Sequence, residues 1–188
     1  LSPPAIELRL AAQEADDRLG GIDPTRSRAC RAHPIVARLT KGFEDGGVLA
    51  RLAPTEVRDV VLEECEDARQ PQLLDEVRAA GIQVVTTTSE WLEASHALRS
   101  AELSLPDRLN IVYAKQHRRV LLATDRPLRR RCELEGVEVH GTLWLVEQVH
   151  RSSLVDAAEV CRWLERWPDV GSRLPVTELK RLRVVLGC

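Results

Sequence analysis

The stretch Val120-Leu121-Leu122-Ala123-Thr124-Asp125-Arg126-Pro127 decides how the rest of the chain is interpreted. Four consecutive apolar residues predict a short strand that is buried on both faces, as in parallel sheets. Asp125 and Pro127 predict that a helix follows at once, because an Asp side chain can cap a first turn and Pro suits its first positions. Asp125 is therefore expected at the carboxyl end of a strand, where ligands bind in open parallel sheets.

The same alternation of strands and helices extends over residues 46–188. We expect strands near residues 82–85, 120–123 and 137–139, a brief extended stretch near residues 55–58, and helices that begin near Val48, Val60, Leu73, Ser89, Ser104, Asp125, Thr142, Asp156 and Thr177. This order predicts an α/β fold, a parallel twisted sheet with helices on both faces.

Residues 1–45 are poorly patterned and are expected to form a distinct N-terminal segment. It offers a short helix over Leu8–Glu14 and only weak strand candidates, at Ile22-Asp23 and over His33–Leu39. These residues form either a remodelled first strand or a separate arm that binds a partner.

Composition limits the classes of function. With 27 Lys and Arg against 29 Asp and Glu, the net charge is −2, so nucleic acid would have to bind at a local basic patch. No apolar run approaches the roughly 20 residues of a membrane span, and no signal peptide is recognisable. A cytoplasmic protein is expected. Reduced thiols are also expected, because no metal-binding spacing links Cys30, Cys65, Cys132, Cys161 and Cys188.

Three acidic positions gain meaning when they are taken together. Asp107 belongs to a capping box that starts at Ser104, Asp125 is a helix cap, and Glu63-Glu64 follow an apolar helical stretch. Each alone is explained by a cap or a solvated helix face. Carboxylates gathered at one end of a sheet repel one another unless a cation intervenes, and Mg²⁺ prefers such oxygen ligands.

Four motifs in the same order resemble those of PIN domains. Residues 123–130 resemble the T-x-D-x-x-L/F-R element, and residues 103–114 resemble the L-S-x-x-D helix with its later Ala. Residues 136–145 resemble the G-V-x-V-x-G-T-L strand and turn, and residues 60–64 resemble the V-V-x-E-E/L helix. The resemblance covers about residues 47–185.

The resemblance implies a three-layer sandwich and a metal-dependent ribonuclease, often the toxin of a toxin–antitoxin pair of the virulence-associated protein C type. By position, Glu64, Asp107 and Asp125 would bind Mg²⁺ or Mn²⁺, and Thr124 would orient water or phosphate. The implied partners are substrate RNA, an antitoxin or another protein, and a second copy in a homodimer, with no membrane contact.

The chain departs from the PIN pattern at its front. PIN domains begin with a central strand that ends in a D-T/S motif, and here Ile22-Asp23-Pro24-Thr25 is the nearest stretch. Asp23 would then be the fourth acid. Without it, the alternative is a catalytically incomplete PIN-like module that binds RNA or a protein partner.

Basic residues surround the strand that ends at Asp125. Arg126, Arg129 and Arg130, with Arg131 behind them and Arg118-Arg119 before the strand, form either a phosphate-binding patch or a solvated helix face. The four Trp residues are expected to pack rather than to stack on bases.

Overall fold

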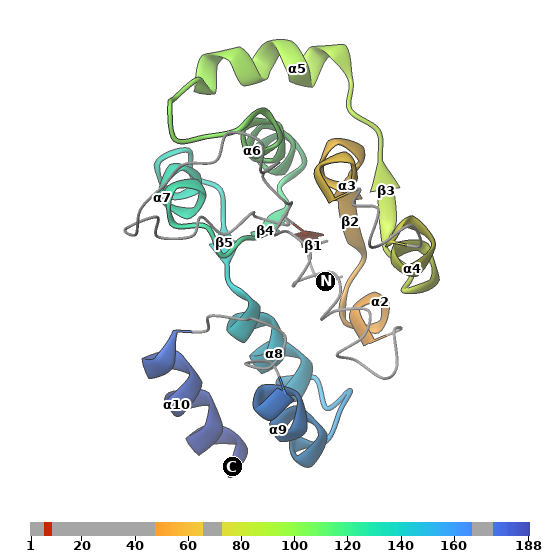
Figure 1. Ribbon diagram of the computed structural model, residues 1–188, viewed down its shortest axis with the longest axis vertical. Helices are drawn as coiled ribbons and strands as arrows, with labels where there is room; N and C mark the ends of the chain where they lie inside the picture. Colours follow the sequence, from red (N-terminus) through yellow and green to blue (C-terminus); the bar gives the residue numbers. More distant parts are fainter. Residues whose placement is uncertain (1–5, 9–47, 66–72, 167–174) are drawn as a thin grey trace, which may run out of the picture.

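The computed structural model describes residues 6–8, 48–65, 73–166 and 175–188 (Figure 1). Its strands are β1 (Ile6–Leu8), β2 (Thr55–Arg58), β3 (Gln83–Val85), β4 (Val120–Leu122) and β5 (Val139–His140). Its helices are α2 (Val48–Leu52), α3 (Asp59–Cys65), α4 (Leu73–Ala79), α5 (Ser89–Ser95), the 3-10 turn η1 (His96–Leu98), α6 (Leu105–His117), α7 (Arg126–Leu134), α8 (Thr142–Arg151), α9 (Ala157–Arg166) and α10 (Val176–Leu186).

The strands form one five-stranded sheet in the order β3-β2-β1-β4-β5. Every pairing is parallel, which confirms the predicted class of fold. The central strand is β1, and it pairs with β2 on one side and with β4 on the other. The prediction of a helix over Leu8–Glu14 was therefore wrong at Leu8, which is the last residue of β1. Three residues carry too little periodicity to reveal a strand, and pairing on both sides decides their conformation.

The central place that the sequence analysis sought for Ile22-Asp23 or His33–Leu39 is filled by Ile6–Leu8. Asp23 and both of those stretches lie outside the described residues.

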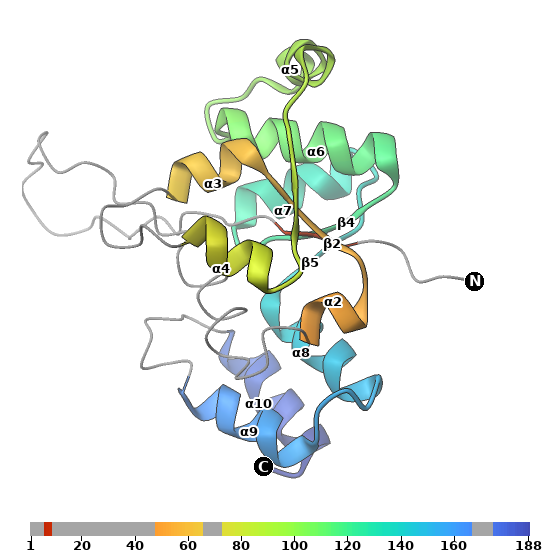
Figure 2. The ribbon, with the colours of Figure 1, turned by 90° about the vertical axis from the view of Figure 1, so that its right-hand side faces the viewer.

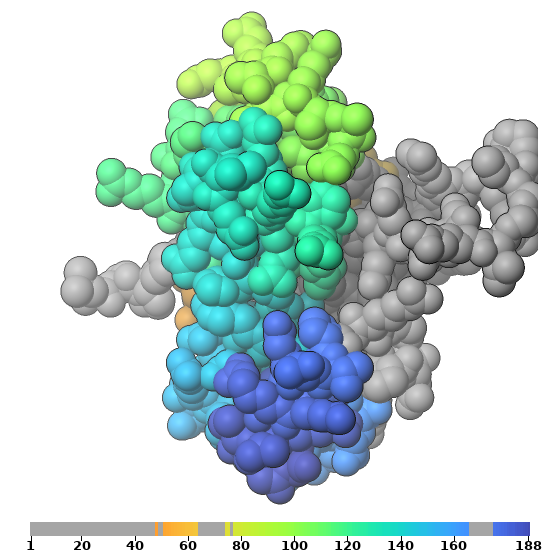
Figure 3. All heavy atoms as spheres, turned by 90° about the vertical axis from the view of Figure 1, so that its left-hand side faces the viewer, coloured from red at the N-terminus to blue at the C-terminus, as the bar shows by residue number. Residues whose placement is uncertain are grey.

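Two apolar clusters cover the two faces of the sheet, which makes three layers (Figures 1 and 2). Leu122 faces a cluster built with α2, α3, α4, α8, α9 and α10. Its neighbour Leu121 faces a second cluster built with η1, α6 and α7. Helix α5 lies across α6, on the side away from the sheet (Figure 2). On the face of the molecule that Figure 3 shows, α5 lies at the top, α7 lies below it and α10 lies at the bottom. No described helix is long and apolar enough to cross a lipid bilayer.

Local chemistry sets the start of α6 and the ends of α4 and α7. The capping box of Ser104 is present, and Gly81 and Gly136 follow helices with left-handed φ angles of 74° and 70°. However, α5 is capped by Thr88 rather than Ser89. Helix α8 begins at Thr142 as a helical residue, and its N-cap is Gly141. In both cases the helix begins at the expected residue, and the residue before it is the cap.

A buried guanidinium holds α5 against the sheet. Arg58 at the end of β2 has no exposed surface, and its guanidinium carbon lies 4.3 Å from the ring centroid of Trp91 and 4.7 Å from that of Tyr113. Such contacts are stronger when they are desolvated. The Trp91 indole N–H also donates to Gln116 at 2.7 Å. The interpretation of Trp91 as a packing residue is confirmed, and Trp163, which is 3% exposed, packs in the core as well.

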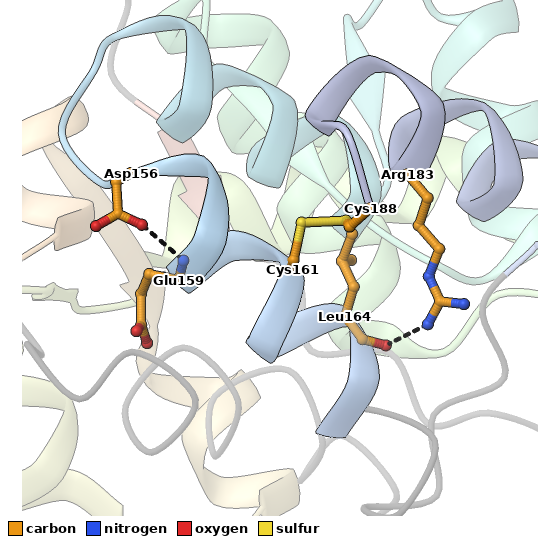
Figure 4. The surroundings of a disulfide bond; sticks show 6 residues. All are labelled: Asp156, Glu159, Cys161, Leu164, Arg183 and Cys188. Carbon is orange, nitrogen blue, oxygen red and sulfur yellow. Dashed lines mark hydrogen bonds between the residues drawn. A yellow bond between two sulfur atoms is a disulfide. The ribbon is translucent and has the colours of Figure 1, made fainter.

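A disulfide between Cys161 and Cys188 joins α9 to the residue that follows Gly187 at the end of α10 (Figure 4). The same view shows the Asp156 carboxylate accepting from the Glu159 N–H at 2.7 Å at the start of α9. The expectation of reduced thiols was therefore wrong for this pair, whereas Cys132 is buried in the apolar cluster beneath α7. A separation of 27 residues gives no spacing signal, and only the packing of α9 on α10 brings these sulfur atoms together.

Glu147 on α8 binds two arginines from one side of the molecule. It accepts from Arg151 at 2.8 Å and from Arg181 of α10 at 2.9 Å. The hydrogen bond from Arg181, opposed by burial and assisted by the charge of Arg151, holds the pKa of Glu147 below its usual range. Glu147 therefore ties α10 to α8 when it is ionised.

We predict that reducing the Cys161–Cys188 bond lowers the free energy of unfolding by about 3 kcal/mol, because the bond removes loop entropy from the unfolded chain. Thermal unfolding of the wild type with and without a phosphine reductant measures this change. The double variant Cys161→Ser, Cys188→Ser is the control and should not respond to the reductant. Equal wild-type midpoints in both buffers would contradict the prediction.

We predict that Glu147→Gln lowers the free energy of unfolding at pH 7 by about 1 kcal/mol, since the amide loses two charge-assisted hydrogen bonds to exposed arginines. A carboxyl with a lowered folded-state pKa stabilises the fold above its unfolded pKa, and this stabilisation is lost as the pH falls through the folded pKa. The difference between wild type and variant should therefore shrink towards acid pH in denaturant titrations. Glu165→Gln, at an exposed position of α9, is the matched control, and a difference that persists at low pH would count against the pairing.

Candidate functional site

Asp107 lies in the first turn of α6 and is held by a reciprocal capping box. Its Oδ2 atom accepts from the Ser104 N–H at 2.8 Å and from the Ser104 hydroxyl at 2.7 Å. The Asp107 N–H in turn donates to the Ser104 hydroxyl at 3.2 Å. The residue is only 7% exposed, so its carboxylate has one defined position.

Asp125 caps α7 directly after β4. Its Oδ2 atom accepts from the Leu128 N–H at 2.8 Å, and Pro127 stands in the first turn. The Ala123 N–H donates to the His140 carbonyl at 2.8 Å, which extends the pairing of β4 with β5 almost to Asp125. The half-buried carboxylate thus stands at the carboxyl end of β4.

The chain order brings both acids to one edge of the sheet. Helix α6 leads directly into β4, so α6 ends at the amino end of that strand and begins at the opposite edge. The first turn of α6, with Asp107, therefore lies at the edge where β4 ends and Asp125 begins α7. Figure 1 shows α6 and α7 side by side over this part of the sheet.

The other predicted metal ligands are less well placed. Glu64 belongs to α3, which starts at the carboxyl end of β2, but its side chain is not among those described, and Asp23 lies outside the described residues. Glu63 is exposed. Within the described part of the chain, no three His, Cys, Asp or Glu residues are grouped closely enough to hold a metal ion. Asp107 and Asp125 offer the hard oxygen donors that Mg²⁺ prefers, but these two alone do not complete a site.

Strand β1 takes the central place of the strand that ends in a D-T/S motif in PIN domains, but this strand does not end in that motif. Strand β1 reads Ile-Glu-Leu and is followed by Arg9. At the end of the neighbouring strand, Asp59 accepts from the N–H and the hydroxyl of Thr87 and from the Val60 N–H. Burial opposes ionisation of Asp59, but these hydrogen bonds outweigh it and lower the pKa. Asp59 therefore serves to join β2 to the end of β3.

A hollow with basic walls opens beside Asp125. Thr124 lines it together with residues of α7 and of the loop before α6, namely Glu102, Arg126, Pro127, Arg129, Arg130 and Glu133. Arg126, Arg129 and Arg130 form no hydrogen bond or ion pair with any residue that the structure describes. These three are therefore the cations of the expected patch that lie at the hollow, whereas the exposed Arg118 follows α6 at the amino end of β4.

The wider basic patch of the sequence analysis was wrong in two places. Arg131 pairs with Glu135 on its own helix at 3.0 Å. Arg119 stands at the amino end of β4, opposite to the site, and forms two hydrogen bonds of 3.0 Å with Glu56. Adjacent positions in sequence face different directions on a helix, and β4 separates Arg119 from α7.

Sequence reasoning missed Glu102 and Glu133, which give the hollow acidic members. The helical spacing of Glu133 from Arg129 and Arg130 could have revealed one of them. Nothing in the sequence marked Glu102, which precedes Leu103-Ser104 in a loop.

The sheet and these acids define a class: a parallel α/β domain with helices on both faces and carboxylates at the carboxyl edge of its strands. Residues 51–186 match a family model, DUF3368, that is described as a PIN domain. The match covers most of the chain, and the protein belongs to the PIN-domain family. No curated protein and no solved structure gave a significant match. The matched region begins after β1.

We predict that Asp125→Asn keeps the wild-type free energy of unfolding within about 0.5 kcal/mol, because an Asn side chain still caps the helix. Asp125→Ala should lose about 1 kcal/mol, since the Leu128 N–H then has no side-chain acceptor. Urea unfolding of the three proteins tests this. If the Asn and Ala variants are equally destabilised, Asp125 stabilises the fold through its charge and not through the cap.

Proposed function

We propose that this chain is a metal-dependent endoribonuclease that hydrolyses RNA phosphodiester bonds. Membership of the PIN family supports a nuclease-type function in general. The observation that supports the specific proposal is that Asp107 and Asp125 lie at one edge of the sheet, beside three arginines that have no partner among the described residues.

The acids are proposed as the metal ligands. Asp107, Asp125 and Glu64 would hold Mg²⁺ or Mn²⁺, with Asp23 as the fourth acid. A divalent ion at such a site lowers the pKa of bound water and stabilises negative charge on a phosphate. The caps on α6 and α7 fix each carboxylate before substrate arrives, which reduces the reorganisation needed for binding. Thr124, exposed in the hollow, is proposed to orient water or a phosphate oxygen.

Arg126, Arg129 and Arg130 are proposed to bind the RNA backbone. At a net charge of −2 the whole protein does not attract RNA, so affinity must come from this local patch. Glu102 and Glu133 in the same hollow limit the patch and would repel a phosphate placed towards them. The backbone is therefore directed along the arginine side, next to Asp125.

The resemblance to toxins extends the proposal to a cytoplasmic toxin of a toxin–antitoxin module, with an antitoxin or another protein partner and a homodimeric state. Sedimentation analysis of the purified chain tests the dimer separately from activity.

A second function is favoured by the absence of a D-T/S motif at the end of β1. An incomplete acidic site would bind RNA or a protein without cleaving it, because fewer carboxylates hold a divalent ion less tightly. In this alternative the arginines of the hollow still bind RNA or a protein, but no RNA is cleaved.

The discriminating experiment combines metal binding with RNA cleavage. We expect millimolar Mg²⁺ or Mn²⁺ to raise the unfolding midpoint of the wild type. A metal concentration of a hundred times Kd corresponds to about 2.7 kcal/mol of added stability. Asp125→Asn should lose both the metal-linked rise and the cleavage of a labelled single-stranded RNA.

Glu165→Gln serves as the control and should keep both properties. A variant Asp125→Asn that cleaves RNA at the wild-type rate would end the nuclease proposal. RNA binding by the wild type without cleavage in either metal would support the incomplete module.

A further inference from the structure

The first turn of α8 has no side-chain cap. Its N-cap is Gly141, with extended φ and ψ angles of −99° and 177°. Any residue can adopt these angles, so the backbone does not require glycine here. Ser, Thr, Asp or Asn would normally accept hydrogen bonds from the first N–H groups of a helix. Gly141, which follows β5, has no side chain that could accept from them.

A second positive group lies against this helix end. Nη1 of Arg129 is 3.5 Å from the position that a Cβ atom on Gly141 would take, and the Ala123 carbonyl oxygen is 3.9 Å from it. Arg129 is half-buried and has no hydrogen bond or ion pair to another described residue. A helix N-terminus carries partial positive charge, so the guanidinium and the helix end repel each other unless an anion lies between them.

The side chain at the mouth of the helix is a third donor. Thr142, the first residue of α8, is only 5% exposed, and its hydroxyl oxygen is buried without a hydrogen-bond partner among the residues that the structure describes. A buried hydroxyl without a partner destabilises a fold. Bound oxygen atoms at the helix mouth would supply the missing partner.

We propose that Gly141, Thr142 and Arg129 form a phosphate-binding subsite at the start of α8. The subsite takes a backbone phosphate of the RNA next to the phosphate that is cleaved, and in this it rests on the proposed function. Backbone N–H groups, a hydroxyl and a guanidinium together suit a tetrahedral oxyanion. The subsite adjoins Asp125, because Ala123 pairs with His140 at the same strand ends.

This subsite gives Arg129 a different role from Arg126 and Arg130. The latter two are exposed and contact RNA by charge alone. Arg129 approaches the helix mouth and fixes the position of one phosphate, which sets the register of the RNA relative to the acids.

Gly141→Ala is the sharpest test. An added Cβ meets Arg129 and Ala123 only at ordinary contact distances, so the fold should keep its unfolding midpoint. The methyl group nevertheless occupies the space between the guanidinium and the helix end. The readout is the backbone amide signals of residues 141–144 in ¹⁵N-labelled full-length protein, titrated with inorganic phosphate in the absence of divalent metal.

We expect saturable shifts at these amides in the wild type, and their loss in Gly141→Ala and Arg129→Gln. Arg78→Gln, on an exposed side chain of α4, is the control for charge and should behave as the wild type. In fluorescence anisotropy with labelled single-stranded RNA, Gly141→Ala should bind about tenfold more weakly, the effect of one lost charge-assisted contact. The slope of log binding constant against log salt concentration should be smaller in magnitude by about 0.7 in Arg129→Gln, because one phosphate contact is lost.

The two proposals fail in different ways. Phosphate shifts at residues 141–144 in a protein that never cleaves RNA would leave the subsite standing and remove the nuclease. Cleavage that depends on Asp125 but is unchanged in Gly141→Ala, with no phosphate shifts at the helix mouth, would overturn the subsite alone.

Discussion

Residues Val120–Leu122 lie between two helical layers, with Leu121 packed on one apolar cluster and Leu122 on the other. Burial on both faces allows only a strand whose neighbours on each side complete its hydrogen bonds, since unpaired backbone groups are costly there. Parallel pairing with β1 and β5 follows from that requirement. It also sends the carboxyl ends of the strands, and the helices that start beyond them, to the same edge. The acids, the hollow and the mouth of α8 share a location for this reason.

The features that could be predicted from the sequence depend on residues that lie close together in the chain. The capping box of Ser104 and Asp107 and the strand–cap–helix order around Asp125 each involve residues within a few positions, and the structure has them as predicted. The parallel α/β class followed from the alternation of such units. The candidate site could be placed at one edge of the sheet, because that edge is fixed by topology and not by side-chain detail.

The parts that could not be predicted depend on contacts between distant segments. Strand β1 has three residues, and only its two neighbours make it a strand. Cys161 and Cys188 meet because α9 packs on α10. The arginines were seen as one patch, yet Arg119 pairs with Glu56, which is 63 residues away along the chain. Sequence spacing carries no information on such a partner, whereas the i,i+4 spacing of Arg131 and Glu135 could have indicated their ion pair.

The bond between Cys161 and Cys188 also changes the connectivity of the molecule. The residues between the two cysteines form a covalent ring that includes the end of α9 and all of α10. A protease that cuts once inside this ring opens it without releasing a fragment, so the two pieces would still migrate as one chain under non-reducing electrophoresis. Only a reductant would then separate them, and a nick in this part of the protein would go unnoticed in a non-reduced sample.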